Sequence, residues 1–292
     1  MPRYINSLLA IILLASPTFS EERVDLVKPA SANGVVEVVN TAGSVTVIGW
    51  TREEVQVQGV LGQGSERLDF DAGPRRTVVR VVWPHNCRAC EGSKLTIKVP
   101  LASDLSVEVV SADIAVQDTT GPCTLKSVSG GVRVSGSASQ VVARSVSGGV
   151  RVEGARGPVR AKSVSGDVLI DGVEGSLEGS TVSGDIKVGG STISRADLAA
   201  VSGSIRWEGT LAPAACLEAK TVSGDITLVL PAETAANFQA MTFSGSIRND
   251  FGPEAKRVSQ YTPERELSFA TGSGGARIVL KSQSGSISLR QR

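Results

Sequence analysis

Residues Val128–Ile170 read VSGGVRVSGSASQVVARS, VSGGVRVEGARGPVRAKS and VSGDVLI, which are two 18-residue segments of one pattern and the start of a third. Related pentapeptides occur nine times, separated by 18, 18, 18, 18, 19, 21, 21 and 40 residues. Self-similarity at a period of about 20 residues is typical of solenoid proteins. The pentapeptides begin at Val110, Val128, Val146, Val164, Val182, Val201, Val222, Phe243 and Gln283, and a relative begins at Thr41.

One repeat can be folded from its apolar positions, with the first residue of the pentapeptide taken as position zero. Apolar or small residues occupy positions −5, −3 and −1, as in Cys123, Leu125 and Ser127, and positions +4 and +6, as in Val132 and Val134. Alternation with a period of two indicates half-buried strands. Each repeat therefore predicts two short strands joined by a Ser-Gly turn, and stacked repeats would place like strands about 4.8 Å apart.

The predicted fold class is all-β: a β-helix-like solenoid of single-stranded coils, each about 18–21 residues long, over residues 101–292. Residues 21–100 predict a β-hairpin-rich N-terminal region, with alternating stretches at Val35–Val39, Val45–Ile48, Val55–Val60, Thr77–Trp83 and Leu95–Val99. The Pro- and charge-rich segment Asn249–Glu266 predicts a loop or cap before the last coil, Arg277–Leu289. Trp207 falls at inward position +6 of a longer coil, where we expect a wider core.

Residues 1–20, MPRYINSLLAIILLASPTFS, have the pattern of a secretory signal peptide. Arg3 precedes a short apolar run, and Thr18 and Ser20 are small enough for a cleavage site after Ser20. A buried N-terminal helix is the alternative. No later stretch is apolar for long enough to cross a membrane as a helix. We expect an exported protein of the periplasm or cell envelope, without an integral membrane span.

The composition of the chain argues against two classes of function. Thirty Lys and Arg side chains face 29 Asp and Glu, for a formal net charge of +1. A dedicated nucleic-acid binder is normally strongly basic, so we expect no nucleic-acid partner. His85 is the single histidine, which excludes any mechanism that needs two.

The segment His85-Asn-Cys87-Arg-Ala-Cys90 is the most concentrated group of reactive side chains. It allows a zinc or copper site, a redox pair, or a local disulfide between Cys87 and Cys90. The disulfide is favoured in an exported protein. Cys123 and Cys216 lie five coils apart, about 24 Å at the strand spacing, and should not pair. A bond from Cys123 to Cys87 or Cys90 stays open.

Cationic side chains form two outward columns. The column at position +5 includes Arg151, but acids at position +7, such as Glu153, lie within reach and make a self-neutralised face. The columns at positions −2 and −4 are less balanced, because their acids occur mainly in the later coils. They predict a basic patch for an acidic or phosphorylated envelope polysaccharide, and the alternative is a lysine-rich face that discourages aggregation. The patch consists of Lys126, Arg144, Arg160 and Lys162.

Aspartates recur at turn position +3, at Asp167, Asp185 and Asp225. Calcium binding is one interpretation, but calcium-binding glycine-rich repeats have a different spacing and more Asp. We interpret these aspartates as turn formers that hydrogen-bond nearby backbone. A lyase or glycosidase would need one unique cluster of carboxylates or bases, whereas the charges here repeat from coil to coil. We therefore expect neither catalytic residues nor a metal or cofactor.

The VSGD[VI] repeats resemble the bacterial "putative adhesin" family of envelope β-solenoid domains. The secretory leader, the VPLASDL sequence at Val99–Leu105 and the closing TGSGGARIVLKSQSGSISL add to the likeness. The resemblance covers about residues 30–290 and implies an exported, repetitive β protein linked to adhesion or envelope stress. It supplies no catalytic residues. The cysteine loop, and Ala112 where glycine is usual, depart from the family pattern.

The leading hypothesis is a non-catalytic exported protein whose flat β faces bind envelope glycans or envelope proteins, in an adhesin-like or structural role. Self-association through the solenoid ends belongs to the same hypothesis. The second hypothesis is a polysaccharide-modifying enzyme on a β-helix scaffold. The third is a metal or redox sensor centred on Cys87 and Cys90.

Overall fold

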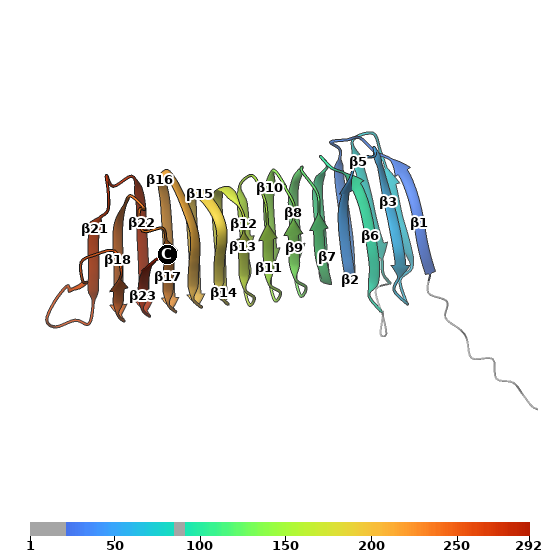
Figure 1. Cartoon of the computed structure of the whole chain (residues 1–292). Coiled ribbons are helices and arrows are strands. Elements are labelled where there is room, and N and C mark those ends of the chain that lie inside the picture. The colour runs from blue at the N-terminus through green and yellow to red at the C-terminus, as the bar shows by residue number, and fades with distance from the viewer. Residues whose placement is uncertain (1–21, 85–90) are drawn as a thin grey trace, which may run out of the picture.

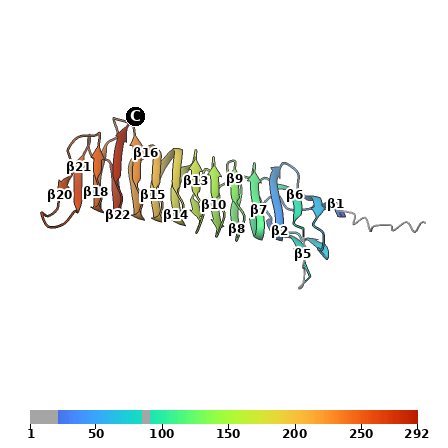
Figure 2. The same cartoon turned by 90° about the horizontal axis from the view of Figure 1, so that it is seen from below.

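The computed structural model describes residues 22–84 and 91–292. Its strands form one 23-stranded mixed sheet, and Figures 1 and 2 show them standing side by side in a long row. The all-β prediction is confirmed. Within the described ranges no helical segment has the length and apolarity that a bilayer crossing requires. The strands are β1 (Glu22–Pro29), β2 (Val35–Trp50), β3 (Glu54–Leu61), β4 (Arg67–Ala72), β5 (Arg76–Val82), β6 (Ser93–Pro100), β7 (Asp104–Gln117), β8 (Pro122–Ser127), β9 (Val132–Ser135), β10 (Gln140–Ser145), β11 (Val150–Glu153), β12 (Val159–Lys162), β13 (Val168–Asp171), β14 (Glu174–Ser183), β15 (Ile186–Ser202), β16 (Ile205–Ser223), β17 (Ile226–Leu230), β18 (Ala236–Ser244), β19 (Ile247–Asn249), β20 (Lys256–Arg257), β21 (Arg265–Ala270), β22 (Ala276–Ser284) and β23 (Ile287–Gln291).

The central strands pair in parallel along two rows. In the first row β8, β10, β12 and β14 follow one another, and in the second row β9, β11, β13 and the start of β15 do so. Cys123 faces Val141, which faces Val159, so each pairing advances by 18 residues. We call one pass along the first row, through a Val-Ser-Gly turn and along the second row, a coil.

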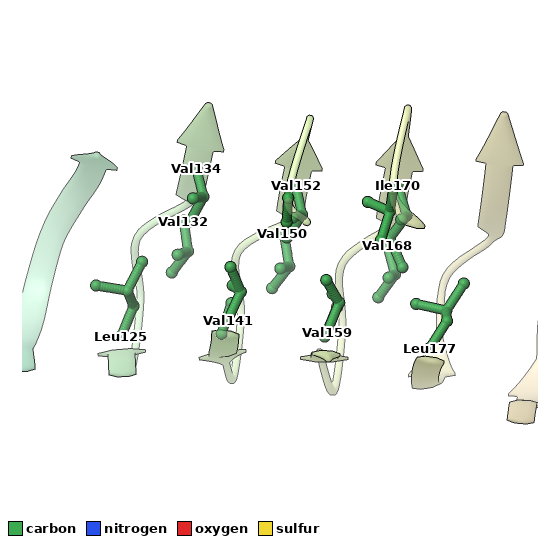
Figure 3. Close-up of a cluster of buried hydrophobic side chains, with 14 of the residues drawn as sticks. Leu125, Val132, Val134, Val141, Val150, Val152, Val159, Val168, Ile170 and Leu177 are labelled. Atoms are coloured by element: carbon green, nitrogen blue, oxygen red, sulfur yellow. The ribbon is translucent and has the colours of Figure 1, made fainter. Parts of the chain in front are cut away.

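The core lies between the two rows. Positions −5, −3, −1, +4 and +6 point inward, as the alternation predicts: Leu125, Val132 and Val134 are all buried. Figure 3 shows the valines of β9, β11 and β13 directed at the side chains of the first row, with Leu125 and Leu177 among them. Trp207 is 1% exposed at its expected inward position.

The turn residues bind one coil to the next. The hydroxyl of Ser145 donates to the carbonyl oxygen of Gly130 in the preceding coil (2.8 Å) and accepts the N–H of Gly148 in its own turn (2.9 Å). A Cβ on Gly148 would lie 2.1 Å from the Gly130 oxygen, so the repeated glycine is required by the close approach of two backbones. Stacking therefore explains the glycine of the Val-Ser-Gly signature and the small hydroxyl residue before the signature.

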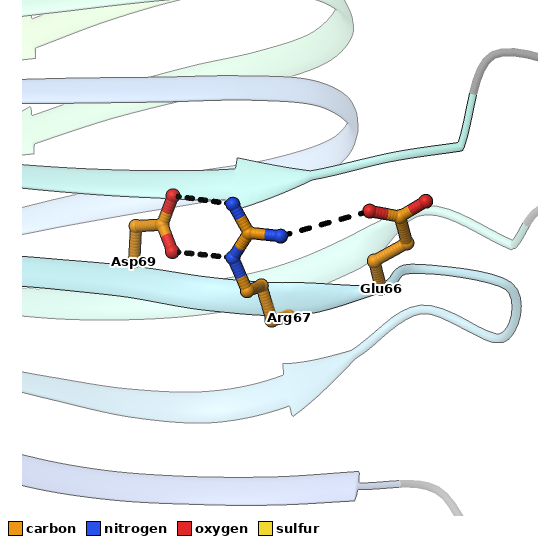
Figure 4. Close-up of polar contacts among 3 residues, drawn as sticks. All are labelled: Glu66, Arg67 and Asp69. Carbon is orange, nitrogen blue, oxygen red and sulfur yellow. Dashed lines mark hydrogen bonds and ion pairs between the residues drawn. The ribbon is translucent and has the colours of Figure 1, made fainter.

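The prediction of a hairpin-rich N-terminal end is met only in part, because β4 and β5 form the one hairpin of consecutive strands in the described part of this end and β2 runs parallel to β5 and β6. β4 pairs with β5, and β1 with β3, in antiparallel fashion, whereas β2 carries the sheet on to β7 by parallel pairing. The expected strands did not include β1 and β4, although Leu68, Phe70 and Ala72 alternate with polar residues in β4. Arg67 on the edge strand β4 pairs with Asp69 (2.8 Å) and contacts Glu66 (3.7 Å), as Figure 4 shows. Charges on an edge strand discourage pairing with another chain.

The C-terminal coil does not lie where its sequence position predicts. β22 pairs with β16 on one side and β18 on the other, and β23 lies between β17 and β19. The last coil of the chain is thus inserted between two coils that precede it. The end of the row is closed instead by β21, which runs antiparallel to β18 and stacks Phe269 on Phe238 with ring centroids 4.6 Å apart. The predicted cap over Asn249–Glu266 includes β20 and reaches the start of β21.

Candidate binding faces

The four cations of the expected basic patch lie together on the first row. Lys126, Arg144 and Lys162 face one another in register on β8, β10 and β12, and Arg160 precedes Lys162 by two residues on the same face. Register neighbours in a sheet lie about 4.8 Å apart, so Arg144 stands between two like charges. The stacking of the coils brings these side chains together although they span 37 residues of sequence.

Two acids border the patch. Glu108 of β7 pairs with Lys126 (2.6 Å), and Glu178 of β14 pairs with both Lys162 (2.5 Å) and Arg160 (2.9 Å). The hydrogen bond from Lys162 is the main cause that lowers the pKa of Glu178 below its usual value. Among the described residues Arg144 has no ion-pair partner.

The second row is largely self-neutralised, as position +7 predicts. Arg151 pairs with Glu153, and Arg206 pairs with Glu208 at 3.1 Å. Lys187 instead contacts Asp185 at 3.8 Å. Arg133 forms no ion pair within the described part of the chain.

The turn aspartates bind the neighbouring coil. Asp167 accepts the N–H of Asp185 (2.9 Å), and Asp185 accepts the N–H of Ser204 (3.0 Å). Asp113 and Asp225 do the same for Gly131 and Ser286. Position +3 is therefore a contact between coils as well as a turn position. In residues 22–84 and 91–292, no group of three His, Cys, Asp or Glu side chains is arranged to hold a metal ion.

The sequence of residues 84–290 matches the family model described as toastrack DUF4097. The chain belongs to the toastrack family. The matched segment runs from the cysteine loop to the last coil and covers most of the 292 residues. The resemblance drawn from the VSGD[VI] repeats is confirmed at the level of family.

Three solved structures are similar to this toastrack protein over most of its length. A "putative cell adhesion protein" from Clostridium sporogenes is 8% identical and covers 93% of this chain and 100% of its own, with a TM-score of 0.23. A "putative adhesin" from Parabacteroides distasonis is 10% identical, covers 92% and 97%, and has a TM-score of 0.38. One from Bacteroides fragilis is 16% identical, covers 92% and 98%, and has the same TM-score. No curated protein matches the chain.

The cysteines of this toastrack protein fall into two groups. The segment with His85, Cys87 and Cys90 lies outside the described residues, so the disulfide, metal and redox interpretations stay predictions. Cys123 and Cys216 are both free thiols. Burial raises the pKa of Cys123, whereas Cys216 is half-buried on the outward face of β16.

One surface feature was missed in the sequence. The first residue of the signature points outward, and seven valines form a column of half-exposed side chains along the turn edge, each 43–52% exposed. The signal was present in the sequence, because position zero directly follows the inward position −1. The column consists of Val110, Val128, Val146, Val164, Val182, Val201 and Val222.

Proposed function

We propose that this protein is a non-catalytic, exported β-solenoid of 18- to 21-residue coils that binds an acidic polysaccharide of the cell envelope through the first-row basic patch. The observation that carries the proposal is the in-register alignment of Lys126, Arg144 and Lys162 over three neighbouring strands. A rigid column of cations at the strand spacing suits a linear polyanion, because repeated charges can meet repeated charges.

The bordering acids limit the strength of this face. Glu108 and Glu178 neutralise part of the column, and exposed pairs of this kind contribute little binding energy after screening. Arg144, which has no such partner among the described residues, is the expected centre of the contact. We expect modest affinity for each protein and a strong dependence on ionic strength.

The experiment measures binding of the purified protein to dextran sulfate and neutral dextran at low and high salt. We expect salt-sensitive binding to dextran sulfate and loss of most of it in the triple variant Lys126→Gln, Arg144→Gln, Lys162→Gln. The matched control is Arg67→Gln, Lys187→Gln, Arg206→Gln, which removes the same charge from cations that lie outside the first-row column. Equal losses in the two variants would contradict a localised patch.

The proposal also covers where the protein is located in the cell and how its two ends could bind another copy. Export, with cleavage after Ser20, would place the Cys87–Cys90 loop in an oxidising compartment, where a disulfide persists. Self-association would use the terminal edge strands. Detection of the chain cleaved after Ser20 in the envelope fraction, and its absence from the cytoplasmic fraction, would support this part of the proposal.

A further inference from the structure

Two neighbouring coils lack the turn aspartate. The sequence VSGGVRV occurs twice, and it places Gly131 and Gly149 at position +3, between coils that carry Asp113 and Asp167 there. Both glycines precede second-row strands, β9 and β11, near the middle of the row in Figure 1. The acidic column is therefore interrupted for two coils.

The interruption leaves two backbone donors without their usual acceptor. In the neighbouring coils the aspartate of one coil accepts the N–H at position +3 of the next, as Asp167 does for Asp185. Gly131 and Gly149 have no side chain to offer to the N–H groups of Gly149 and Asp167. No other acceptor within the described ranges is hydrogen-bonded to these two groups. Gly149 and Asp167 are both exposed residues, so we expect an external acceptor to reach their N–H groups.

The same two coils carry arginines close to the positions where the aspartate side chains are missing. Arg133 and Arg151 follow the glycines by two residues on the same face and pair in register with each other. Arg151 is engaged by Glu153, whereas Arg133 forms no ion pair in the described chain. A hollow of about 610 Å³ lies over this region, a volume within the usual range of small-molecule sites. Its lining includes Gly131, Gly149, Arg133, Arg151, Asp113 and Asp167.

We propose that this hollow is a carboxylate-binding site for an oligouronate. The carboxylates of the sugar take the places that aspartates occupy in the other coils, accept the N–H groups of Gly149 and Asp167, and face the Arg133 guanidinium. Charge-assisted hydrogen bonds of this type are the stronger ones in proteins.

The molecule itself shows that this arrangement is tolerated. Asp167 and Asp185 place carboxylates in adjacent coils and each accepts a backbone N–H, so acids one coil apart do not disrupt the stack. The spacing of the coils also disfavours an extended acidic peptide as the ligand. Side chains on one face of an extended peptide recur about every 6.6 Å, whereas neighbouring coils lie about 4.8 Å apart.

This site lies on the second row and is separate from the first-row patch. An experiment can therefore contradict one of the two proposals without contradicting the other. The test follows the backbone amide signals of the ¹⁵N-labelled protein by NMR during titration with tri-galacturonate. We expect the largest shifts at Gly149 and Asp167. Tri-glutamate and the methyl ester of the sugar are the comparison probes, and equal binding of either would overturn the assignment.

Two double variants give positions 131 and 149 a side chain that can accept the N–H groups of Gly149 and Asp167. In Gly131→Asp, Gly149→Asp the added carboxylates restore the regular pattern, and in Gly131→Ser, Gly149→Ser a neutral hydroxyl does so, as Ser204 does toward the N–H of Asp225 (3.4 Å). The nearest atoms to a Cβ at these positions lie 3.6 Å and 3.3 Å away, so both variants should fold. We expect at least a fivefold loss of affinity in each, and a severalfold loss in Arg133→Gln.

The matched control is Ser204→Asp, Ser286→Asp, which adds the same two charges at the same turn position in distant coils and should bind tri-galacturonate as the wild-type protein does. Wild-type affinity in the serine variant would overturn the proposal. Shifts confined to the amides around Lys126 and Arg144 would also overturn it while supporting the first-row patch.

Discussion

The hydroxyl of Thr242 donates a hydrogen bond to the carbonyl oxygen of Gly285, 2.8 Å away and 43 residues later in the chain. Ser145 makes the same bond to Gly130, which lies 15 residues earlier. The hydroxyl before each signature thus identifies the coil on which it stacks. Ser282 in turn donates to Gly224 (3.2 Å), so the final coil is bonded on both sides to coils made before it.

Removal of the final coil should therefore open the end of the molecule. Deletion of residues 276–292 leaves β16 and β18 without the strand between them, and β18 and β21 should lose amide protection together. Hydrogen exchange with mass spectrometry checks this, with protection in β8–β13 as the internal control, because coils of a repeat protein contact mainly their neighbours. Retained protection in β18 and β21 would contradict the inserted arrangement.

Loss of one turn hydroxyl should destabilise the stack. Ser145→Ala removes the donor to Gly130 and the acceptor of the Gly148 N–H, which we expect to cost about 1–3 kcal/mol of unfolding free energy. Ser145→Thr should be near neutral, because Thr181 makes the equivalent bond. Urea unfolding measures both, and exposed Ser147→Ala is the control. A cost as large for the control would refute the assignment.

The two adjacent glycines of one turn should differ in their response to alanine. A Cβ on Gly148 would meet backbone oxygen at 2.1 Å, whereas one on Gly149 would meet its nearest atom at 3.3 Å. We expect Gly148→Ala to cost about 1–3 kcal/mol, as for other overpacked sites, and Gly149→Ala to cost markedly less. Thermal unfolding followed by circular dichroism compares them. Equal melting temperatures would show that coil spacing adjusts freely.

Acid should weaken the bond between β12 and β14. Because Lys162 lowers the pKa of Glu178 in the folded state, the unfolded chain binds more protons at low pH. The stabilisation is complete above the ordinary Glu pKa of 4.5 and is lost as pH falls through the lower folded pKa. The side chain is 36% exposed, so we expect less than about 1 kcal/mol.

The pH dependence is measured as the free energy of unfolding between pH 7 and pH 2. Glu178→Gln should flatten the acid limb of the curve slightly. Glu174→Gln, which changes an exposed acid of the same strand, should leave it unchanged. Superimposable curves for Glu178→Gln and the wild-type protein would remove the proposed contribution.

The two free thiols should react at different rates. Burial disfavours the thiolate of Cys123, whereas Cys216 is partly accessible. Brief alkylation of the native protein at pH 8, followed by peptide mass spectrometry, should label Cys216 first, since the thiolate is the reactive form. Labelling of Cys123 at the unfolded rate would show that the core opens there.

The sequence predicts the local geometry of this molecule well. Val132, Val134 and Trp207 are buried as the alternation requires, because the period of two is a property of each strand alone. The position of the last coil was not predictable in this way. Thr242 and Ser282 occupy the same place in the repeat, and either could stack on the Gly224 coil.

The charged faces were predictable in part. The cations of the patch were found because they occupy one column, but Glu108 was overlooked although it lies in that column one coil earlier. The interruption at Gly131 and Gly149 is visible as Gly in place of Asp. Its meaning depends on a fact that only the stacked structure supplies, namely that each aspartate serves the next coil.

The constant advance of 18 residues between β8, β10 and β12 has a consequence for the history of the chain. Each of these coils makes the same bonds to the coil before it, so an 18-residue gene duplication here would insert a complete coil and leave the others in their environments. The row would lengthen by about 4.8 Å with each event. Relatives can therefore differ in reach by whole steps while keeping the same ends, which makes length itself a heritable and adjustable property of such a protein.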